Sequence, residues 1–105
     1  MDTRAARVGK NEAVFREVNE RINDVARENA AEYLCECGNA TCTETIQMTV
    51  SDYEDVRRVP THFAVLPGHE LPDLEEVVGR NEGFLVVRKK AGAAAALATE
   101  LDPRS

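Results

Sequence analysis

Three cysteines, all that the chain contains, fall within eight consecutive residues as Cys35, Cys37 and Cys42. Thiolate sulfur is a preferred ligand of soft and borderline metals, and three sulfurs this close suit one tetrahedral ion. Gly38 directly follows Cys37, and we expect it to adopt a positive φ where the backbone wraps around the metal. The spacing is not the common one of two residues between paired cysteines. The sequence nevertheless predicts a metal-binding loop here, with a fourth ligand supplied from elsewhere.

The fourth ligand is predicted to be His69. It follows Pro67 and Gly68, a pair typical of a turn, from which an imidazole can reach a metal. His62 is the alternative, but it lies at the start of a predicted strand. Three acidic residues are weaker candidates, because a site with three thiolates favours nitrogen or sulfur in its last position. They are Glu36, Glu44 and Glu70.

Zinc is the predicted metal, and an iron–sulfur cluster is the alternative. Clusters usually take four cysteines and more apolar shielding than this acidic loop offers. Without a metal, the cysteines would be small buried apolar side chains, but their loop is rich in Gly, Asn, Thr and Glu. A redox pair of Cys35 and Cys37 would close a strained and therefore labile ring.

Catalysis has less support in the residues. Cys42 and His69 offer a nucleophile and a base, but crowded cysteines favour metal ligation over one activated thiolate. If His69 did not ligate, an open site of three cysteines and a water would resemble those of zinc hydrolases and deaminases. The His-x-Glu and Cys-x-x-Cys motifs of the deaminases are absent from the sequence.

A long helix is predicted from Asn11, its expected N-cap, to about Tyr33. Apolar residues recur there at spacings of three and four, with charged residues between them. We expect this apolar stripe to pack on the chain's own domain, and an intermolecular coiled coil is the alternative. The stripe consists of Val14, Phe15, Val18, Ile22, Val25 and Ala26.

Shorter elements follow the cysteine loop. Alternating or β-branched residues predict three strands, two short helices join them, and Asn81 to Gly83 form a turn. Ser51 is the expected N-cap of the first short helix. The strands are expected at 45–50, 61–66 and 84–90, and the helices at 51–58 and 73–79.

The predicted fold is α+β, with the long N-terminal helix packed on a small, mostly antiparallel three-stranded sheet that carries the metal-binding loop. Residues 1–10 are expected to form a flexible arm and residues 11–90 a single zinc-stabilised domain. Residues 91–105 are rich in alanine and offer few large side chains for packing. We therefore expect them to form a frayed helix or a disordered tail.

Composition limits the classes of function. The 105 residues carry a net charge of −6, and residues 35–83 hold ten acidic but only three basic side chains. Such a surface disfavours nucleic acid, whose phosphates are bound by clustered Lys and Arg. The sequence shows neither an apolar run of membrane-spanning length nor a secretory leader, and an odd number of cysteines argues against a disulfide framework. We therefore expect a cytoplasmic protein that does not enter membranes.

Several segments together resemble a family of small uncharacterised proteins from high-GC Gram-positive bacteria, the actinobacteria. The resemblance covers nearly the whole chain, and its most specific pieces are Cys-Glu-Cys and Pro-Gly-His-Glu. It implies a stand-alone cytoplasmic protein whose two distinctive motifs contain the proposed ligands, and it implies no activity. The matching segments are 11–22, 34–38, 42–44, 53–57, 67–70 and 102–104.

The sequence thus predicts a small zinc-stabilised binding or regulatory module without enzymatic activity, which contacts a protein partner. A homodimer is an open alternative for that partner. The first rival function is a metal- or thiol-dependent enzyme. The second is a nucleic-acid-binding zinc module, which would require Arg57, Arg58, Arg80 and residues 88–90 to converge on one face.

Overall fold

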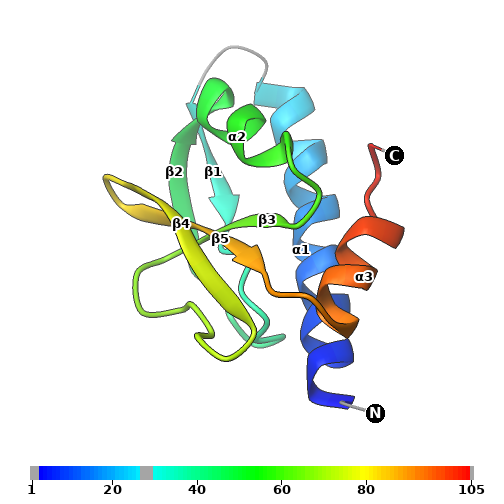
Figure 1. Ribbon diagram of the computed structural model, residues 1–105. Coiled ribbons are helices and arrows are strands. Elements are labelled where there is room, and N and C mark those ends of the chain that lie inside the picture. The colour runs from blue at the N-terminus through cyan, green and yellow to red at the C-terminus, as the bar shows by residue number, and fades with distance from the viewer. Residues whose placement is uncertain (1–2, 27–29, 105) are drawn as a thin grey trace.

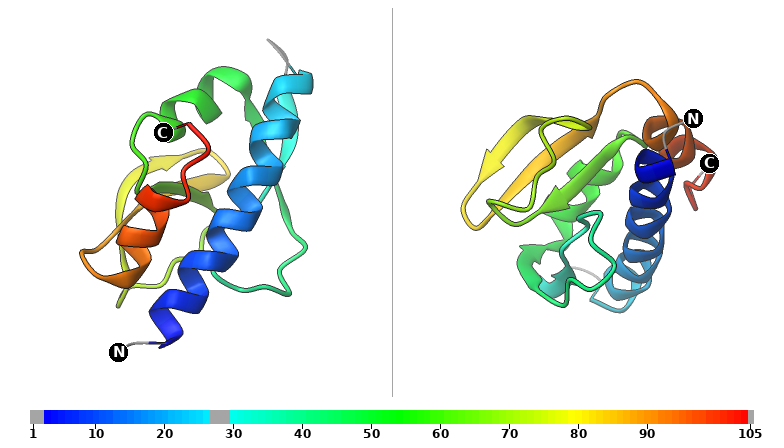
Figure 2. Two further views of the ribbon diagram at one scale, coloured as in Figure 1. Left: turned by 90° about the vertical axis from the view of Figure 1, so that its right-hand side faces the viewer. Right: turned by 90° about the horizontal axis from the view of Figure 1, so that it is seen from below.

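The computed structural model describes residues 3–26 and 30–104. A single long helix, α1 (Thr3–Ala26), runs along one side of the molecule (Figure 1). At 1.5 Å per residue its 24 residues extend about 36 Å, most of the 41 Å long axis of the molecule. Both antiparallel sheets lie on one side of α1, and a short helix, α3 (Ala93–Glu100), packs beside its N-terminal half (Figure 2).

The bounds of α1 correct two predictions. The helix begins at Thr3 and not at Asn11, so residues 3–10 are no flexible arm. It also does not continue to Tyr33: residues 27–29 lie outside the described residues, and a strand, β1 (Ala30–Leu34), follows them. Tyr33 on β1 stacks on Tyr53, with ring centroids 4.6 Å apart. This tertiary contact stabilises a strand where the local residue pattern favoured helix.

The two ends of the chain were mispredicted for one shared reason. Ala5 and Val8 of α1 are buried, as are Ala94 and Ala98 of α3. A Cβ added to Gly9 would lie 3.1–3.3 Å from Leu97 and Ala94, which shows how closely the two helices approach. Small residues permit this approach, so each terminal segment covers the other. The alanine-rich segment 93–100 is therefore a packed helix and not a frayed one.

The orientation of α1 also differs from the prediction. Val14, Val18 and Val25 are 60%, 40% and 83% exposed, so much of the expected apolar stripe faces outward. The buried face of the helix is polar instead, and its side chains bond to other elements. The fully or nearly buried polar residues on this face are Glu12, Arg16, Asn19 and Asn23.

Two antiparallel sheets replace the single three-stranded sheet of the prediction. β1 pairs with β2 (Thr45–Thr49), and β3 (His62–Val65) pairs with β5 (Phe84–Lys89), which pairs with β4 (Glu75–Asn81). The α+β class with a long N-terminal helix is confirmed. The prediction of a helix at 73–79 is wrong, because the β-branched residues Val77 and Val78 belong to β4, which pairs with β5. The turn predicted at 81–83 joins these two strands, with Gly83 at φ +89°.

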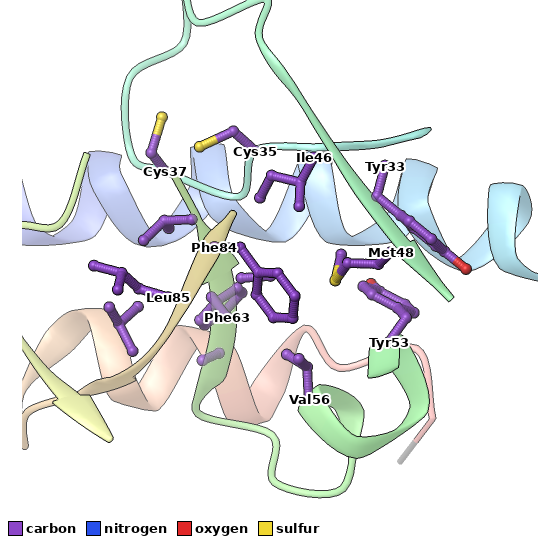
Figure 3. Packing of buried hydrophobic residues seen from close by; sticks show 14 residues of the cluster. Tyr33, Cys35, Cys37, Ile46, Met48, Tyr53, Val56, Phe63, Phe84 and Leu85 are labelled. Atoms are coloured by element: carbon purple, nitrogen blue, oxygen red, sulfur yellow. The ribbon is translucent and has the colours of Figure 1, made fainter. Parts of the chain in front are cut away.

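A short helix, α2 (Val50–Arg57), connects β2 to β3. Its N-cap is Thr49, whose hydroxyl accepts a hydrogen bond of 3.0 Å from the Asp52 backbone N–H, and not Ser51 as expected. The hydrophobic core lies between α2, the two sheets and α3 (Figure 3). Figure 3 shows Cys35 and Cys37 at one end of this core and the stacked tyrosines Tyr33 and Tyr53 at the other.

Candidate metal centre

The four predicted ligands lie together in the folded chain. One donor atom from each of Cys35, Cys37, Cys42 and His69 lies within 4.8 Å of all the others, and this group could hold a metal ion. Cys35 and Cys37 are buried, while Cys42 and His69 are partly exposed. The three cysteines, all within the described part of the chain, are free thiols. Residues from two separate segments of the chain therefore converge.

The segment between β1 and the loop is held by Glu36, which lies between two of the cysteines. Its backbone N–H donates to the Ala64 carbonyl at 2.8 Å, and its carboxylate accepts from the Ala64 N–H at 3.0 Å. The same carboxylate accepts from Asn19 at 2.9 Å and from Tyr53 at 2.8 Å. With Glu36 anchored in the core, the flanking thiols of Cys35 and Cys37 are free to take part in the site.

A tight turn returns Cys42 to the site. The Cys42 N–H donates to the Asn39 carbonyl at 3.0 Å. The Asn39 side-chain oxygen accepts from the N–H and the hydroxyl of Thr41, at 3.0 and 2.7 Å. An asparagine side chain that bonds its own backbone two residues on is a common way to build such a turn. At the base of the loop, the Cys35 N–H donates to the Glu44 carbonyl at 3.1 Å.

His69 reaches the site from the turn that follows β3. Its N–H donates to the Leu66 carbonyl at 2.9 Å, which closes a four-residue turn with Pro67 and Gly68 at the centre. Gly68 has φ +92°, and proline followed by a residue of positive φ is the pattern of a type II turn. The Glu70 carboxylate accepts from the Gly68 N–H at 2.7 Å, so it supports the turn.

Gly38 is required for a different reason from the one predicted. The described glycines with positive φ are Gly68, Gly83 and Gly92, and Gly38 is not among them. A Cβ on Gly38 would instead lie 2.5 Å from Cγ1 of Val8. The Gly38 carbonyl also accepts a hydrogen bond of 2.9 Å from the Asn11 side chain. The loop thus lies directly against α1, and a glycine is needed for this close approach.

The two nitrogens of His69 face different partners. Nδ1 lies 3.5 Å from the sulfur of Cys35 and 3.7 Å from that of Cys42. Nε2 lies 3.0 Å from a carboxylate oxygen of Glu44. A histidine that binds metal through one nitrogen commonly donates the other N–H to a carboxylate, which fixes the tautomer and the ring orientation. Glu44 therefore occupies the position of this supporting carboxylate.

The sulfur–nitrogen distances match a tetrahedral centre. Zinc lies about 2.3 Å from thiolate sulfur and about 2.0–2.1 Å from imidazole nitrogen, so tetrahedral geometry places the two donors about 3.5–3.6 Å apart. The observed separations of 3.5 and 3.7 Å agree with this value. His69 Nδ1 and these two sulfurs thus have the spacing of ligands to one ion.

The surroundings of Cys35 and Cys37 make these two thiols poor acids in the absence of a cation. Burial raises the pKa of Cys35, and the adjacent Cys37 and Cys42 raise it further because neighbouring thiolates repel. Burial also raises the pKa of Cys37. The Leu66 N–H donates to the Cys35 sulfur at 3.3 Å and opposes the first of these shifts. A bound dication would reverse this balance, because it stabilises all three thiolates together.

The other ligand candidates fall outside the group. His62 on β3 pairs in register with Arg88, and its pKa is lowered by burial and by that charge. The carboxylate of Glu36 is committed to the core, and that of Glu70 to the turn backbone. Sequence reasoning considered Glu44 only as a ligand and missed the anchoring roles of Asn19 and Tyr53. Asn19 lies 16 residues before Cys35 and Tyr53 lies 11 residues after Cys42, so no local pattern could identify these two residues.

Comparison of the chain with protein family models, with curated proteins and with solved structures finds no match. None of the described helices combines the length and the apolarity that a membrane-spanning segment requires.

Proposed function

We propose that Cys35, Cys37, Cys42 and His69 bind one Zn²⁺ as a closed structural centre of a non-enzymatic binding module. The observation that carries this proposal is the position of His69 Nδ1, at tetrahedral ligand distance from two of the sulfurs. Four protein ligands fill a tetrahedral zinc and leave no position for substrate.

The centre would stabilise the fold by joining its two sheets. Cys35 directly follows β1 of the two-stranded sheet, and His69 follows β3 of the three-stranded sheet. A metal held between these segments fixes the sheets relative to each other. Binding free energy at such a site becomes folding free energy, because the unfolded chain has no preformed site.

Zinc fits the donor set better than an iron–sulfur cluster. Three thiolates and one imidazole form a common closed zinc site, whereas clusters usually take four thiolates. Glu44 against His69 adds a carboxylate next to the centre and leaves it without apolar cover on that side. We place the protein in the cytoplasm, where reducing conditions keep such thiols available for metal.

The module's partner is proposed to be a protein. Two of the basic residues that a nucleic-acid surface would need are buried, which weighs against that rival. The Arg57 side chain has no exposed area, and it pairs with Glu20 and Asp102. The Lys89 side chain also has no exposed area, and it pairs with Glu12 and Glu75. These cations are neutralised inside the molecule and cannot contact phosphates.

Elemental analysis of protein purified without chelator or a His-tag tests the metal centre. We expect one zinc per chain, and loss of zinc together with a lower melting temperature in Cys42→Ser and His69→Ala. His62→Ala is the matched control and should retain its zinc. Wild-type protein without metal, with an unchanged melting temperature in Cys42→Ser, would rule the centre out. Iron with acid-labile sulfide would instead identify a cluster.

One observation favours a thiol-dependent enzyme as the second candidate. The imidazole of His69 lies between Cys42 and Glu44 in space. Its Nδ1 is 3.7 Å from the Cys42 sulfur, and its Nε2 is 3.0 Å from the Glu44 carboxylate. Nucleophile, base and orienting acid have this order in cysteine hydrolases. A cavity of about 270 Å³ is lined by His69 and by Cys37, but Cys42 is not among its lining residues.

Thiol labelling of the native protein separates the two candidates. A closed zinc centre protects all three cysteines until a chelator is added. An enzyme of the second kind would label rapidly and selectively at Cys42, with a rate that falls in His69→Ala. Labelling of Cys42 in protein that carries one zinc per chain would contradict the closed centre.

A further inference from the structure

An apolar face on the C-terminal half of α1 has no covering element among the described residues. It comprises the exposed Val14, Val18 and Val25 of α1 and Ala30 of β1, together with Ile22 and Ala31, which also pack partly against the core, and we call it the α1 apolar face. In Figure 2 this half of α1 extends beyond the end of α3. A groove of about 540 Å³ runs along it between α1 and β1.

The exposure of this face follows from how α1 is anchored. On the opposite side of the helix, Arg16 donates to the carbonyls of Pro60 and Ala98, each at 2.8 Å. Asn19 bonds the backbone of Leu34 in both directions, at 2.9 and 2.7 Å. These buried polar groups would lose their partners if the helix turned its valines inward. The valines therefore remain outside, where a contiguous apolar patch commonly marks a contact surface.

The charged residues beside the α1 apolar face are complementary to the same residues of a second copy. Glu17 and Arg21 lie on the same side of α1, with 3.7 Å between their charged groups, and both are largely exposed. When two such helices pack antiparallel about a two-fold axis, the same flank of each helix meets in the contact. With Glu17 at the level of Arg21 of the copy, Val14 lies within one residue, about 1.5 Å along the axis, of the level of Val25 of the copy. Two ion pairs then form across the axis.

We propose that the α1 apolar face binds a second copy of this chain, through an antiparallel two-fold contact between α1 helices. The contact covers the exposed valines. Glu17 of each copy then pairs with Arg21 of the other copy. A two-fold contact requires a self-complementary surface, and an apolar row flanked by one acid and one base meets that requirement. The inference goes beyond the metal centre and uses none of its residues.

Charge exchange tests the identity of the occupant. Glu17→Arg places two bases on the flank and Arg21→Glu places two acids, so each variant repels its own copy. Sedimentation equilibrium should show self-association about tenfold weaker in each, because two close pairs are replaced by repulsion. An equimolar mixture of the two variants should form a heterodimer of near wild-type affinity. A different partner protein would produce no such rescue.

A second matched pair controls for general effects of charge. Asp55 of α2 and the C-cap residue Arg58 form an exposed ion pair at 3.0 Å, and neither belongs to the α1 apolar face. Asp55→Arg and Arg58→Glu should leave association unchanged. Val18→Glu should weaken self-association at least tenfold. Val78→Glu should leave self-association unchanged, and it is a matched control because Val18 and Val78 are 40% and 44% exposed.

Wild-type protein that stays monomeric from about 10 μM to about 1 mM would overturn the proposal. So would a mixture that fails to restore association, or control variants that weaken it equally. Circular dichroism and zinc content are measured for every variant. A zinc-loaded monomer would contradict only the dimer, whereas a dimer without zinc would contradict only the metal centre.

Discussion

Glu44 lies 3.0 Å from Nε2 of His69, on the side of the imidazole that faces away from the cysteine sulfurs. The pair joins the end of the cysteine loop to the turn after β3. In the tautomer whose Nε2–H donates to Glu44, the Nδ1 lone pair is directed to the sulfurs.

Removing the Glu44 carboxylate should weaken zinc binding without abolishing it. Glu44→Ala is expected to lower zinc affinity by about 10- to 100-fold, because the imidazole loses its orienting acceptor. Competition with a chromophoric chelator measures the change. Glu82→Ala, in the exposed turn between β4 and β5, is the control and should bind zinc as the wild type does. Equal affinities in all three proteins would contradict the supporting role of Glu44.

Gly38→Ala should destabilise the fold, because the new methyl group would lie 2.5 Å from Val8. Overpacking of this kind costs about 1–3 kcal/mol of unfolding free energy. The double variant Gly38→Ala with Val8→Ala should lose about 1 kcal/mol less unfolding free energy than the two single variants lose in sum. Urea unfolding of the four proteins measures this coupling. Strict additivity would show that the loop does not meet α1 there.

Glu36→Ala should be among the most damaging substitutions in the site. It leaves the buried donors of Asn19, Tyr53 and Ala64 without their acceptor, and a loss of about 3 kcal/mol or more follows. Tyr53→Phe removes one of these bonds and should lose about 1 kcal/mol. Urea unfolding with excess chelator separates this packing effect from metal binding. A smaller loss in Glu36→Ala than in Tyr53→Phe would contradict the anchor.

The buried ion cluster of Glu12, Glu75 and Lys89 should make stability depend on pH. Burial, with help from a hydrogen bond to Glu75, raises the pKa of Glu12 from 4.5 to about 9 against the opposing charge of Lys89. The folded protein therefore keeps a proton that the unfolded chain releases above pH 4.5. Stability from this group is complete below pH 4.5, falls by up to about 1.4 kcal/mol per pH unit, and levels off above pH 9.

Glu12→Gln should remove this dependence, since a neutral amide takes no part in the titration. The difference in unfolding free energy between wild type and variant, measured in urea at constant zinc from pH 6 to pH 9, isolates Glu12 from the metal ligands. The unfolding free energy of the variant should increase relative to that of the wild type as the pH rises. A difference that stays constant over this range would place the ionised form of Glu12 in the folded protein.

The candidate ligands and the elements that depend on local residue patterns could be predicted from the sequence. Cys35, Cys37 and Cys42 are close in any fold because they are close in the chain, and Pro67 and Gly68 specify the turn that presents His69. The alternation of β2 and the turn at Gly83 likewise need no distant contact. Such features depend on backbone preferences that each residue carries with it.

Which faces are buried, and which residues hold the site in place, depends on contacts between segments that are distant in the chain. The apolar period of α1 predicted an inward stripe, but Arg16 and Asn19 found buried partners far along the chain and turned Val14 and Val18 outward. The contact of Gly38 with Val8 and that of Glu44 with His69 also join distant segments. Polar groups gain most where they are buried with partners, and a single sequence does not show where those partners will lie.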